Sequence, residues 1–487
     1  MSGRLSAAVK PKPLTARNHH DVSRFTFGVN PAVIKDVRTR GSSNAWFDAQ
    51  LRPTTIKDSA ADAAASWFPR LAHGPGQAWS EVKAGRASAW DYGMDFTSWT
   101  LARRILSNRQ VHEVMSDFWS NLLYIPACED RSFPWRHSYD QVIRKNALSS
   151  YGALLRAAVV HPAMSGWLTN HENTKRGVNE NLGRELLELF TVGRGSGYTE
   201  ADVLNASRLL TGFRVRIFDG YDASYSPNDH WTGPVTVLGF RHANSDPDGR
   251  PALAALLTYL STHPATAERI ARRLCRRFVR DEPPGAIVKA VATAYSRSGG
   301  DVKASLKALR AHPEYYASRR SKLRTPVEDA INVARLLGMR PTGRGNDHGF
   351  VRQLVWMSES MGQQPFRWPR PDGFPETSEV YASPARMLRS WELHYALPGN
   401  WWKSTAMTRP KQASTLPTQW PRRLDEIVEH QSRMLLGRSA DPEALRAISR
   451  VLQRPASARW RRASEVDPWH LIVIRGTLLN TPHGMLR

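Results

Sequence analysis

The feature that most constrains the fold is the spacing of apolar residues, which recur three and four positions apart over most of the chain. From about Pro31 to about Arg214 this pattern is broken mainly at prolines and glycines, and it resumes over residues 251–337, 349–397 and 422–487. Such a period is typical of helices that bury one face. Pro31 also suits the first turn of a helix. The sequence therefore predicts an all-α fold, a large body of many packed helices.

One segment departs from the helical pattern. Residues 213–248 hold two short alternating runs, at Val215 and Ile217 and at Val235 and Val237, among Gly, Pro, Asn and Asp. Alternation over a few residues between turn-forming residues is typical of strands. This segment predicts a small hairpin or a long structured loop inserted into the helical body.

The chain has 487 residues, enough for two or three average domains or for one large helical unit. Residues 398–421 are rich in Pro, Thr, Ser and Trp, which suits either a linker or an arm wrapped over the surface. The predicted organisation is a basic disordered arm at 1–18, a helical body at 19–397, the linker or arm at 398–421, and C-terminal helices of the same unit at 422–487.

The balance of charge is strongly basic, with 68 Lys and Arg against 44 Asp and Glu and a formal net charge of +24. This charge favours contact with an anionic ligand or polymer, although a merely solvated Arg-rich surface has the same composition. The segment from Glu268 to Arg280 concentrates six arginines around an apolar stripe. It suits binding of phosphate or sulfate, or pairing with acidic neighbours.

Compartment is predicted from what the chain lacks. Cys128 and Cys275 are the only cysteines, too few for a disulfide framework or a cysteine-rich metal site. The stretch from Met1 to Thr15 has no apolar run of signal-peptide length, and no run approaches the roughly 20 apolar residues of a transmembrane helix. These observations predict a cytoplasmic protein without a transmembrane segment.

The most informative polar pattern lies between Val178 and Gly193. Drawn as a helix with about 100° per residue, this segment has a broad apolar face and a narrow polar stripe opposite. Gly193 suits the end of this helix, and Thr199 with Asp202 predicts a capping box at the start of the next. The apolar face consists of Leu182, Leu186, Leu189 and Phe190, and the stripe of Asn181, Arg184, Glu185 and Glu188, with Leu187 beside it.

Two interpretations of the stripe remain open. It is either the solvated edge of a surface helix, with ordinary pairs from Glu180 to Arg184 and from Arg184 to Glu188, or a partly dry cluster. A partly dry cluster must be paired internally or bind something, because unpaired buried charge is costly. Two carboxylates and an asparagine suit a divalent cation or an acid–base pair, and the spacing does not choose between them.

A His-Pro dipeptide occurs three times between helical stretches, beginning at His161, His263 and His312. A residue before proline is pushed out of the helical region, and proline is preset for a first helical turn. The dipeptide therefore predicts helix junctions. His161 precedes the polar segment and is also a candidate site residue.

Common catalytic signatures are absent from the sequence. It contains no Gly-rich phosphate loop, no dinucleotide fingerprint, no nucleophile elbow and no His pair with zinc spacing on a helix. These classes of enzyme are therefore disfavoured.

Many short motifs occur in a fixed order along the chain. Around the polar segment they are His161-Pro-Ala-Met164, Asn179-Glu-Asn181, Arg184-Glu185, Glu188-Leu-Phe-Thr191, Tyr198-Thr-Glu-Ala-Asp202 and Leu210-Thr-Gly212. Elsewhere they are Phe25-Thr-Phe-Gly28, Phe118-Trp119 with Asn121, His230 with Gly233, His263-Pro-Ala-Thr266, Met361-Gly-Gln363 with Pro365, and Pro371-Asp-Gly373. Together they resemble the large bacterial domain-of-unknown-function family 1800, over about residues 18 to 480.

The resemblance implies no established activity. It implies that relatives are commonly exported, and that their genes often neighbour an uncharacterised family similar to sulfatases and phosphatases, a possible partner. This chain lacks an export signal, and it has Ser120 and Leu122 where the family often has two histidines. Phe190 also stands where many members have histidine. A histidine-rich metal site is therefore less expected here than in the family at large.

We expect the candidate residues to converge on one concave pocket. The expected function is a hydrolase- or transferase-like enzyme whose pocket binds a divalent cation or an anionic ligand. The alternative is a non-catalytic binding or assembly protein whose basic surface contacts polyanions. The predicted catalytic residues are Glu185, Glu188, His161 and His230, and the predicted ligand-binding residues are Asn179, Glu180, Asn181 and Arg184.

Overall fold

The structure, a computed structural model, describes residues 13–346 and 349–487. Its elements are mostly helices with small two-stranded sheets, which confirms the predicted all-α class with a small strand insertion. Residues 1–12 of the predicted arm lie outside the described residues. The end of that arm is helical rather than irregular, because Ala16, Arg17 and Asn18 belong to the first helix, α1 (Ala16–Arg24). Thr15 caps this helix by accepting the N–H of Asn18 at 3.2 Å.

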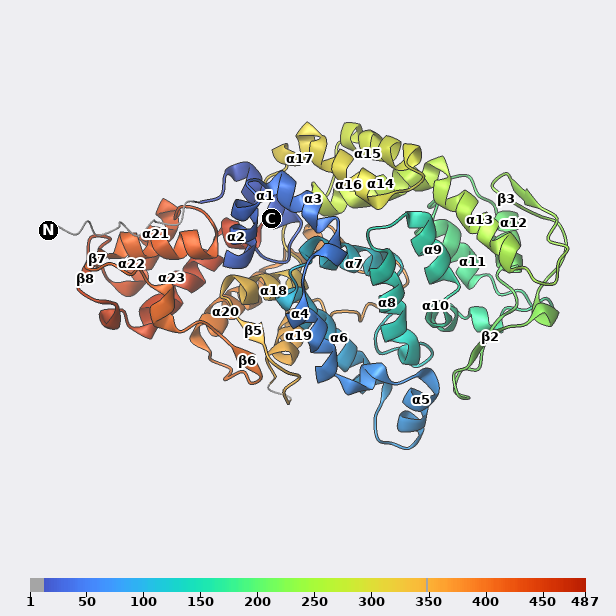
Figure 1. Cartoon of the computed structure of the whole chain (residues 1–487), viewed down its shortest axis with the longest axis horizontal. Coiled ribbons are helices and arrows are strands. Elements are labelled where there is room, and N and C mark those ends of the chain that lie inside the picture. The colour runs from blue at the N-terminus through green and yellow to red at the C-terminus, as the bar shows by residue number, and fades with distance from the viewer. Residues whose placement is uncertain (1–12, 347–348) are drawn as a thin grey trace.

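The N-terminal part of the chain runs from short helices, which lie between the C-terminal helices and the centre of the molecule, to longer helices near its middle (Figure 1). Pro31 occupies the first turn of α2, as predicted, and the side chain of Asn30 caps that helix. The helices after α1 are α2 (Pro31–Thr39), α3 (Ser43–Gln50), α4 (Ser59–Ala63), α5 (Pro75–Lys83), α6 (Ala89–Leu106), α7 (Gln110–Leu122), α8 (Arg136–Asn146), α9 (Tyr151–Val159) and α10 (Pro162–Trp167).

The middle of the chain contains the polar segment, the predicted insertion and a series of helices that pack on their sequence neighbours. Its helices are α11 (Asn181–Glu185), the π-helix η6 (Leu186–Phe190), α12 (Glu200–Leu209), α13 (Arg250–Thr262), α14 (Pro264–Phe278), α15 (Gly285–Arg297), α16 (Val302–Ala311) and α17 (Pro313–Ala317).

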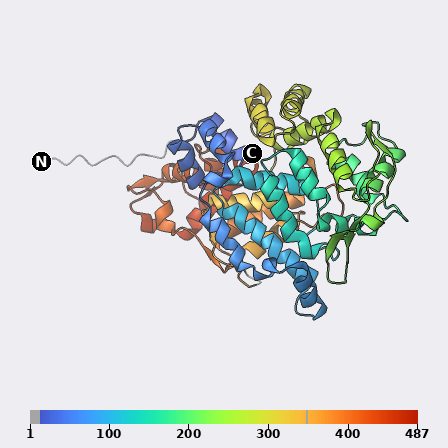
Figure 2. The same ribbon diagram turned by 45° about the vertical axis from the view of Figure 1, so that its right-hand side comes forward.

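The C-terminal helices begin in the middle of the molecule and finish at the end away from the insertion. Figures 1 and 2 both place the last of them, drawn in red, beside the first helices of the chain and place the insertion at the opposite end. They are α18 (Pro326–Leu336), α19 (Phe350–Ser360), α20 (Pro384–Gly399), α21 (Leu424–Leu435), α22 (Pro442–Leu452), α23 (Pro468–Leu479) and α24 (Pro482–Met485).

The insertion forms two antiparallel hairpins, which decides between the two structures that its sequence allowed. Strand β1 (Phe213–Val215) pairs with β2 (Ala223–Tyr225), and β3 (Val235–Val237) pairs with β4 (Phe240–His242). Val235 and Val237 face the core while the residue between them is exposed, as the alternation predicts.

Residues 398–421 lie against the helical body. Within them, β6 (Met407–Thr408) pairs with β5 (Arg340–Pro341). Thr415 accepts a hydrogen bond from Gln431 at 2.6 Å, and Gln412 donates to the carbonyl of Val466 at 3.1 Å. These contacts favour the wrapping arm over the free linker. A last small sheet joins β7 (Arg422–Arg423) to β8 (Arg459–Trp460).

Two central helices, α6 and α18, form the middle of the core (Figure 1). Every residue of α18 is buried, and so is every residue of α6 from Tyr92 to Leu106. Both helices nevertheless carry Arg, Asp and Glu side chains, which must be paired inside the protein. Within the described residues, none of the helices combines the length and apolar composition that spanning a membrane requires.

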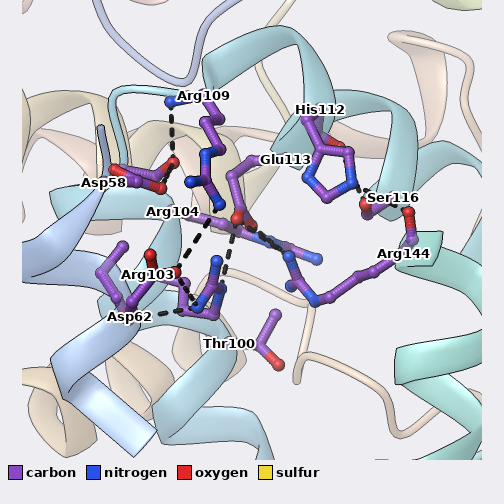
Figure 3. A network of polar contacts seen from close by, with 12 residues as sticks. Asp58, Asp62, Thr100, Arg103, Arg104, Arg109, His112, Glu113, Ser116 and Arg144 are labelled. Atoms are coloured by element: carbon purple, nitrogen blue, oxygen red, sulfur yellow. Dashed lines mark hydrogen bonds and ion pairs between the residues drawn. The ribbon is translucent and has the colours of Figure 1, made fainter. Parts of the chain in front are cut away.

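Glu113, on α7, is the centre of one buried ionic network (Figure 3). Its carboxylate accepts N–H groups from Arg144 on α8, at 2.8 Å to each oxygen, and from Arg103 on α6 at 3.3 Å. Arg144 also donates to Asp140 at 2.5 Å. Burial opposes ionisation of Glu113, but the two guanidinium groups outweigh it and lower its pKa to about 2. The network therefore joins three helices through one carboxylate.

The polar segment does not continue as one regular α-helix. Its second half, η6, is a π-helix, whose wider turn rotates the side chains relative to an α-helix. Leu187 is fully buried, so its predicted place beside the polar stripe was wrong, whereas Leu189 is only partly buried but packs against the core as predicted. The other residues of the predicted apolar face are buried: Leu182, Leu186 and Phe190.

Candidate functional site

The two asparagines of the predicted site order the start of α11. The side-chain oxygen of Asn179 accepts the N–H of Asn181 at 3.0 Å. Both side-chain amides donate to Thr169 Oγ1, at 3.1 and 2.9 Å, and the N–H of Asn179 donates to Asn173 at 2.9 Å. The two amides therefore meet at one hydroxyl group.

Arg184 pairs with carboxylates near the surface. Its Nη2 lies 3.1 Å from Glu180 and 2.6 Å from Glu200 on α12. The first pair is the expected contact between residues four apart. The other expected pair, with Glu188, does not form, because Glu200 takes that place. The Arg184 side chain is 35% exposed, so these pairs contribute little to stability.

Glu185 and Glu188 have contrasting surroundings. Glu188 is 8% exposed and accepts hydrogen bonds at 2.6 Å from both Tyr198 Oη and Arg194 Nε. Burial opposes its ionisation, but these two donors outweigh burial and lower the pKa of Glu188. Glu185 is partly buried and forms no hydrogen bond or ion pair with a described residue. Burial, then the charges of Glu188 and Asp372, raise the pKa of Glu185.

The boundaries of the polar segment form as predicted. Gly193 ends it with a left-handed φ of 86°, and its N–H donates to the carbonyl of Leu187 at 2.8 Å. A Cβ on Gly193 would lie 3.0 Å from the Arg269 guanidinium, so the close approach also requires glycine. Thr199 and Asp202 form the capping box of α12.

The two histidines of the predicted site lie apart from the carboxylates in the hydrogen-bond network. His161 caps α10 by accepting the N–H of Ala163 at 3.2 Å, and burial lowers its pKa to about 4. His230 is buried between Thr211 and Asn244, each 3.1 Å from one of its ring nitrogens. Neither histidine forms a hydrogen bond or ion pair with Glu185 or Glu188.

All three His-Pro dipeptides start helices as predicted. In each, proline occupies the first turn and the histidine ring accepts an N–H of the same turn. The histidines are His161, His263 and His312.

The arginine-rich segment, now seen as most of α14, is largely paired. Arg272 pairs with Glu268 at 2.8 Å, and Arg280 pairs with Glu314 at 3.3 Å. Arg269 donates to the carbonyl of Leu189 at 3.0 Å, which satisfies a backbone group of the π-helix. Pairing with neighbours is one of the two alternatives that the sequence left open.

A polar interior cavity was missed by the sequence reasoning. It has a volume of about 50 Å³ and is lined by charged side chains from α6, α7, α14 and α18. Arg104 and Arg277 bind Asp117 at 2.7 and 2.8 Å, and Arg277 and Arg487 bind Glu328 at 2.8 and 2.6 Å. A space of this size holds water or a small ion rather than an organic substrate. The residues come from positions 104 to 487, so no local spacing reveals the cluster.

Several motif residues meet at this cavity. Asn121, Gln363 and Pro365 line it, as does Ser120. The Ser120 hydroxyl accepts a hydrogen bond from Arg136 at 3.1 Å. Glu376 also lines the cavity, and both of its carboxylate oxygens are buried without a hydrogen-bond partner.

The buried, ion-paired carboxylate of Glu328 predicts that the protein loses stability in acid. Burial opposes ionisation of Glu328, but Arg277 and Arg487 outweigh it and lower its pKa to about 2 from the ordinary 4.5. A folded-state pKa below the unfolded value means that the stabilisation is complete above about pH 4.5 and is lost as pH falls toward 2. Chemical denaturation across this range is expected to show falling stability, with a shallower fall in Glu328→Gln than in the exposed control Glu443→Gln. Equal slopes would contradict the assignment.

Within the described ranges, no group of three or more His, Cys, Asp and Glu residues is arranged to hold a metal ion. Among these residues, the divalent cation expected at the polar stripe therefore finds no cluster of three such ligands. Glu185 and Glu188 are the two adjacent carboxylates that the stripe offers.

Comparison with known proteins identifies a sequence family but no individual relative. The sequence model of the family described as "Protein of unknown function (DUF1800)" matches residues 20–485. No curated protein and no solved structure matches the chain. The match covers nearly the whole chain, and the chain belongs to this family of proteins of unknown function.

Proposed function

We propose that this chain is a hydrolase- or transferase-like enzyme that uses Glu185 and Glu188 as a pair of catalytic carboxylates. The observation that carries the proposal is their contrast in bonding. Glu188 is held by Tyr198 and Arg194, whereas Glu185 is partly buried and unbonded. Neighbouring carboxylates in different environments are a common arrangement for acid–base chemistry, because one stays ionised while the other keeps a proton.

In this proposal Glu185 is the general acid. Its raised pKa, caused by burial and by the charge of Glu188, favours a protonated carboxyl group that donates its proton to a leaving oxygen. Glu188 stays ionised and stabilises positive charge that develops on the substrate. Asn179, Asn181, Glu180 and Arg184 belong to the same polar segment and are proposed to contact the ligand.

In this proposal His161 and His230 do not transfer protons. Their hydrogen bonds to a helix start and to the insertion support a positioning role rather than proton transfer. His161 is further disfavoured as a base by its pKa of about 4, which burial lowers.

Activity of Gln variants tests the proposal. We expect turnover in a panel of p-nitrophenyl phosphate, sulfate, acetate and glycosides, and a loss in kcat on the order of 10²-fold in Glu185→Gln and in Glu188→Gln. The control is Glu268→Gln, which removes an exposed carboxylate that is paired with Arg272. Lack of turnover throughout the panel, or equal rates in all three variants, would contradict the proposal.

The pH dependence of kcat is a separate expectation. Protonation of Glu188 at its lowered pKa limits the rate on the acid side, and ionisation of Glu185 at its raised pKa limits it on the alkaline side. A bell-shaped profile is therefore expected, with loss of activity as pH rises through the Glu185 pKa. A rate that keeps rising with pH would show that Glu185 is not the acid.

The second candidate is a non-catalytic binding protein that contacts polyanions through its basic surface. The net charge of +24 favours it. Its test is the affinity for heparin, which would fall steeply with added salt.

A further inference from the structure

A large cavity lies away from the carboxylate pair, at the end of the molecule where the first and last helices meet. Its volume is about 510 Å³, within the range typical of small-molecule sites. Its walls come from α1, from the residues after α17, from the loop after α21 and from the C-terminal residues. Figure 1 shows these segments together, although they are far apart in sequence.

The lining of this cavity is cationic. It includes Arg319, Arg320 and Arg438 and contains no Asp or Glu. In the part of the chain that the structure describes, none of these three arginines pairs with a carboxylate. Arg487 also lines the cavity, but its guanidinium binds Glu328 at 2.6 Å. Arg319 and Arg320, whose side chains are exposed, therefore form no ion pair, and Arg438 has only the electrostatic attraction of the nearby Asp441.

Arg438 has a hydrogen-bond donor without an acceptor. Its Nη1 donates to His483 Nδ1 at 2.8 Å, and its Nε is buried without a hydrogen-bond partner. On the far side of His483, Asp441 lies 3.7 Å from Nε2. Arg438 is partly buried, and its buried Nε is a donor that a further acceptor in the cavity would satisfy.

The positive charge of Arg438 also lowers the pKa of two histidines that line the cavity. Burial and then the Arg438 charge lower the pKa of His483 to about 4. His19, which donates to the carbonyl of Leu436 at 2.9 Å, has its pKa lowered to about 4, mainly by burial and with a contribution from Arg438. Both rings are therefore neutral at neutral pH, and the positive charge of the cavity belongs to the arginines.

One residue of the cavity wall has a backbone conformation that its residue type rarely adopts. Arg320 has a left-handed φ of 60°, which side chains with a Cβ rarely adopt. Gly437 has a φ of 65°, and a Cβ there would lie 3.3 Å from the His19 ring. Glycine adopts this φ readily, so the backbone strain belongs to Arg320, and strained residues cluster at ligand sites.

We propose that this cavity binds a small organic molecule that carries a phosphate or sulfate group. Arginine donors match the oxygens of a tetrahedral oxyanion, and a bound oxyanion would neutralise the unpaired guanidinium charges. The volume exceeds what an inorganic oxyanion alone would fill, so an attached organic group is expected. This site is independent of the proposed acid–base pair.

Binding is best measured by calorimetry on the full chain at constant ionic strength, with phenyl phosphate, phenyl sulfate, inorganic phosphate and a short oligonucleotide as probes. The variants are Arg438→Met and Arg320→Asn, since asparagine tolerates the left-handed backbone. The control is Arg297→Met, which removes an exposed arginine on α15.

We expect a phenyl ester to bind more tightly than inorganic phosphate. Arg438→Met and Arg320→Asn should each weaken that binding about tenfold, the effect of one lost charge-assisted contact, and Arg297→Met should leave it unchanged. Whichever ester binds more tightly identifies the group. Absence of ester binding, equal weakening in all three variants, or binding of the oligonucleotide alone would overturn the proposal.

Discussion

Replacing Glu113 with Gln is expected to lower the free energy of unfolding by roughly 3 to 5 kcal/mol, the cost of breaking a buried ion pair. Glu113 is fully buried and receives three guanidinium hydrogen bonds. Gln keeps the shape but turns one acceptor into a donor that faces Arg144. Because total stabilities are typically about 5 to 15 kcal/mol, this change is a large share of the whole.

The matched control is Glu81→Gln, which removes the partner of Arg86 at the surface. An exposed ion pair is screened by solvent and contributes little to stability, so this variant should unfold nearly as the parent does. Urea denaturation followed by circular dichroism compares the two. If both variants unfold at the same urea concentration as the parent, the network around Glu113 does not stabilise the fold as inferred.

Replacing Leu186 with Ala is expected to cost roughly 2 to 5 kcal/mol, because a buried side chain leaves a cavity. Leu187→Ala should cost a similar amount, since Leu187 is equally buried in η6. Leu189→Ala should cost clearly less, because Leu189 is only partly buried. The same denaturation experiment ranks the three variants.

The comparison of these leucines also tests the π-helix. An ordinary α-helix would place Leu189 on the buried face and Leu187 beside the polar stripe. A larger loss of stability in Leu189→Ala than in Leu187→Ala would therefore contradict the π-helical geometry of Leu186–Phe190. The Glu185→Gln variant should leave stability almost unchanged, because its carboxylate forms no hydrogen bond.

Local features of the fold could be predicted from sequence because short-range rules determine them. The first turn at Pro31, the His-Pro helix starts and the Thr199 capping box depend on neighbours within four residues. The hairpins of the insertion follow from alternation between turn residues in the same way. The π-helix was missed because the apolar period alone assumes a regular turn.

The sites were harder to predict because they depend on distant residues. The position of Glu188 in the stripe was visible, but its partner Arg194 lies beyond the helix and replaced the expected Arg184. The interior cavity joins Arg104 to Glu328 through Arg277 and Asp117, and no periodicity relates these positions. Pairing between such distant residues becomes visible only in three dimensions.

The central claim, that their surroundings raise the pKa of Glu185 and lower that of Glu188, is tested most directly by titrating the two carboxyl groups. Carbon-13 NMR of protein labelled at the Glu carboxyl carbon follows them, and Glu185→Gln and Glu188→Gln assign the two resonances. The account predicts a pKa above the ordinary 4.5 for Glu185 and below it for Glu188. Equal pKa values for the two groups, or a higher value for Glu188, would contradict it.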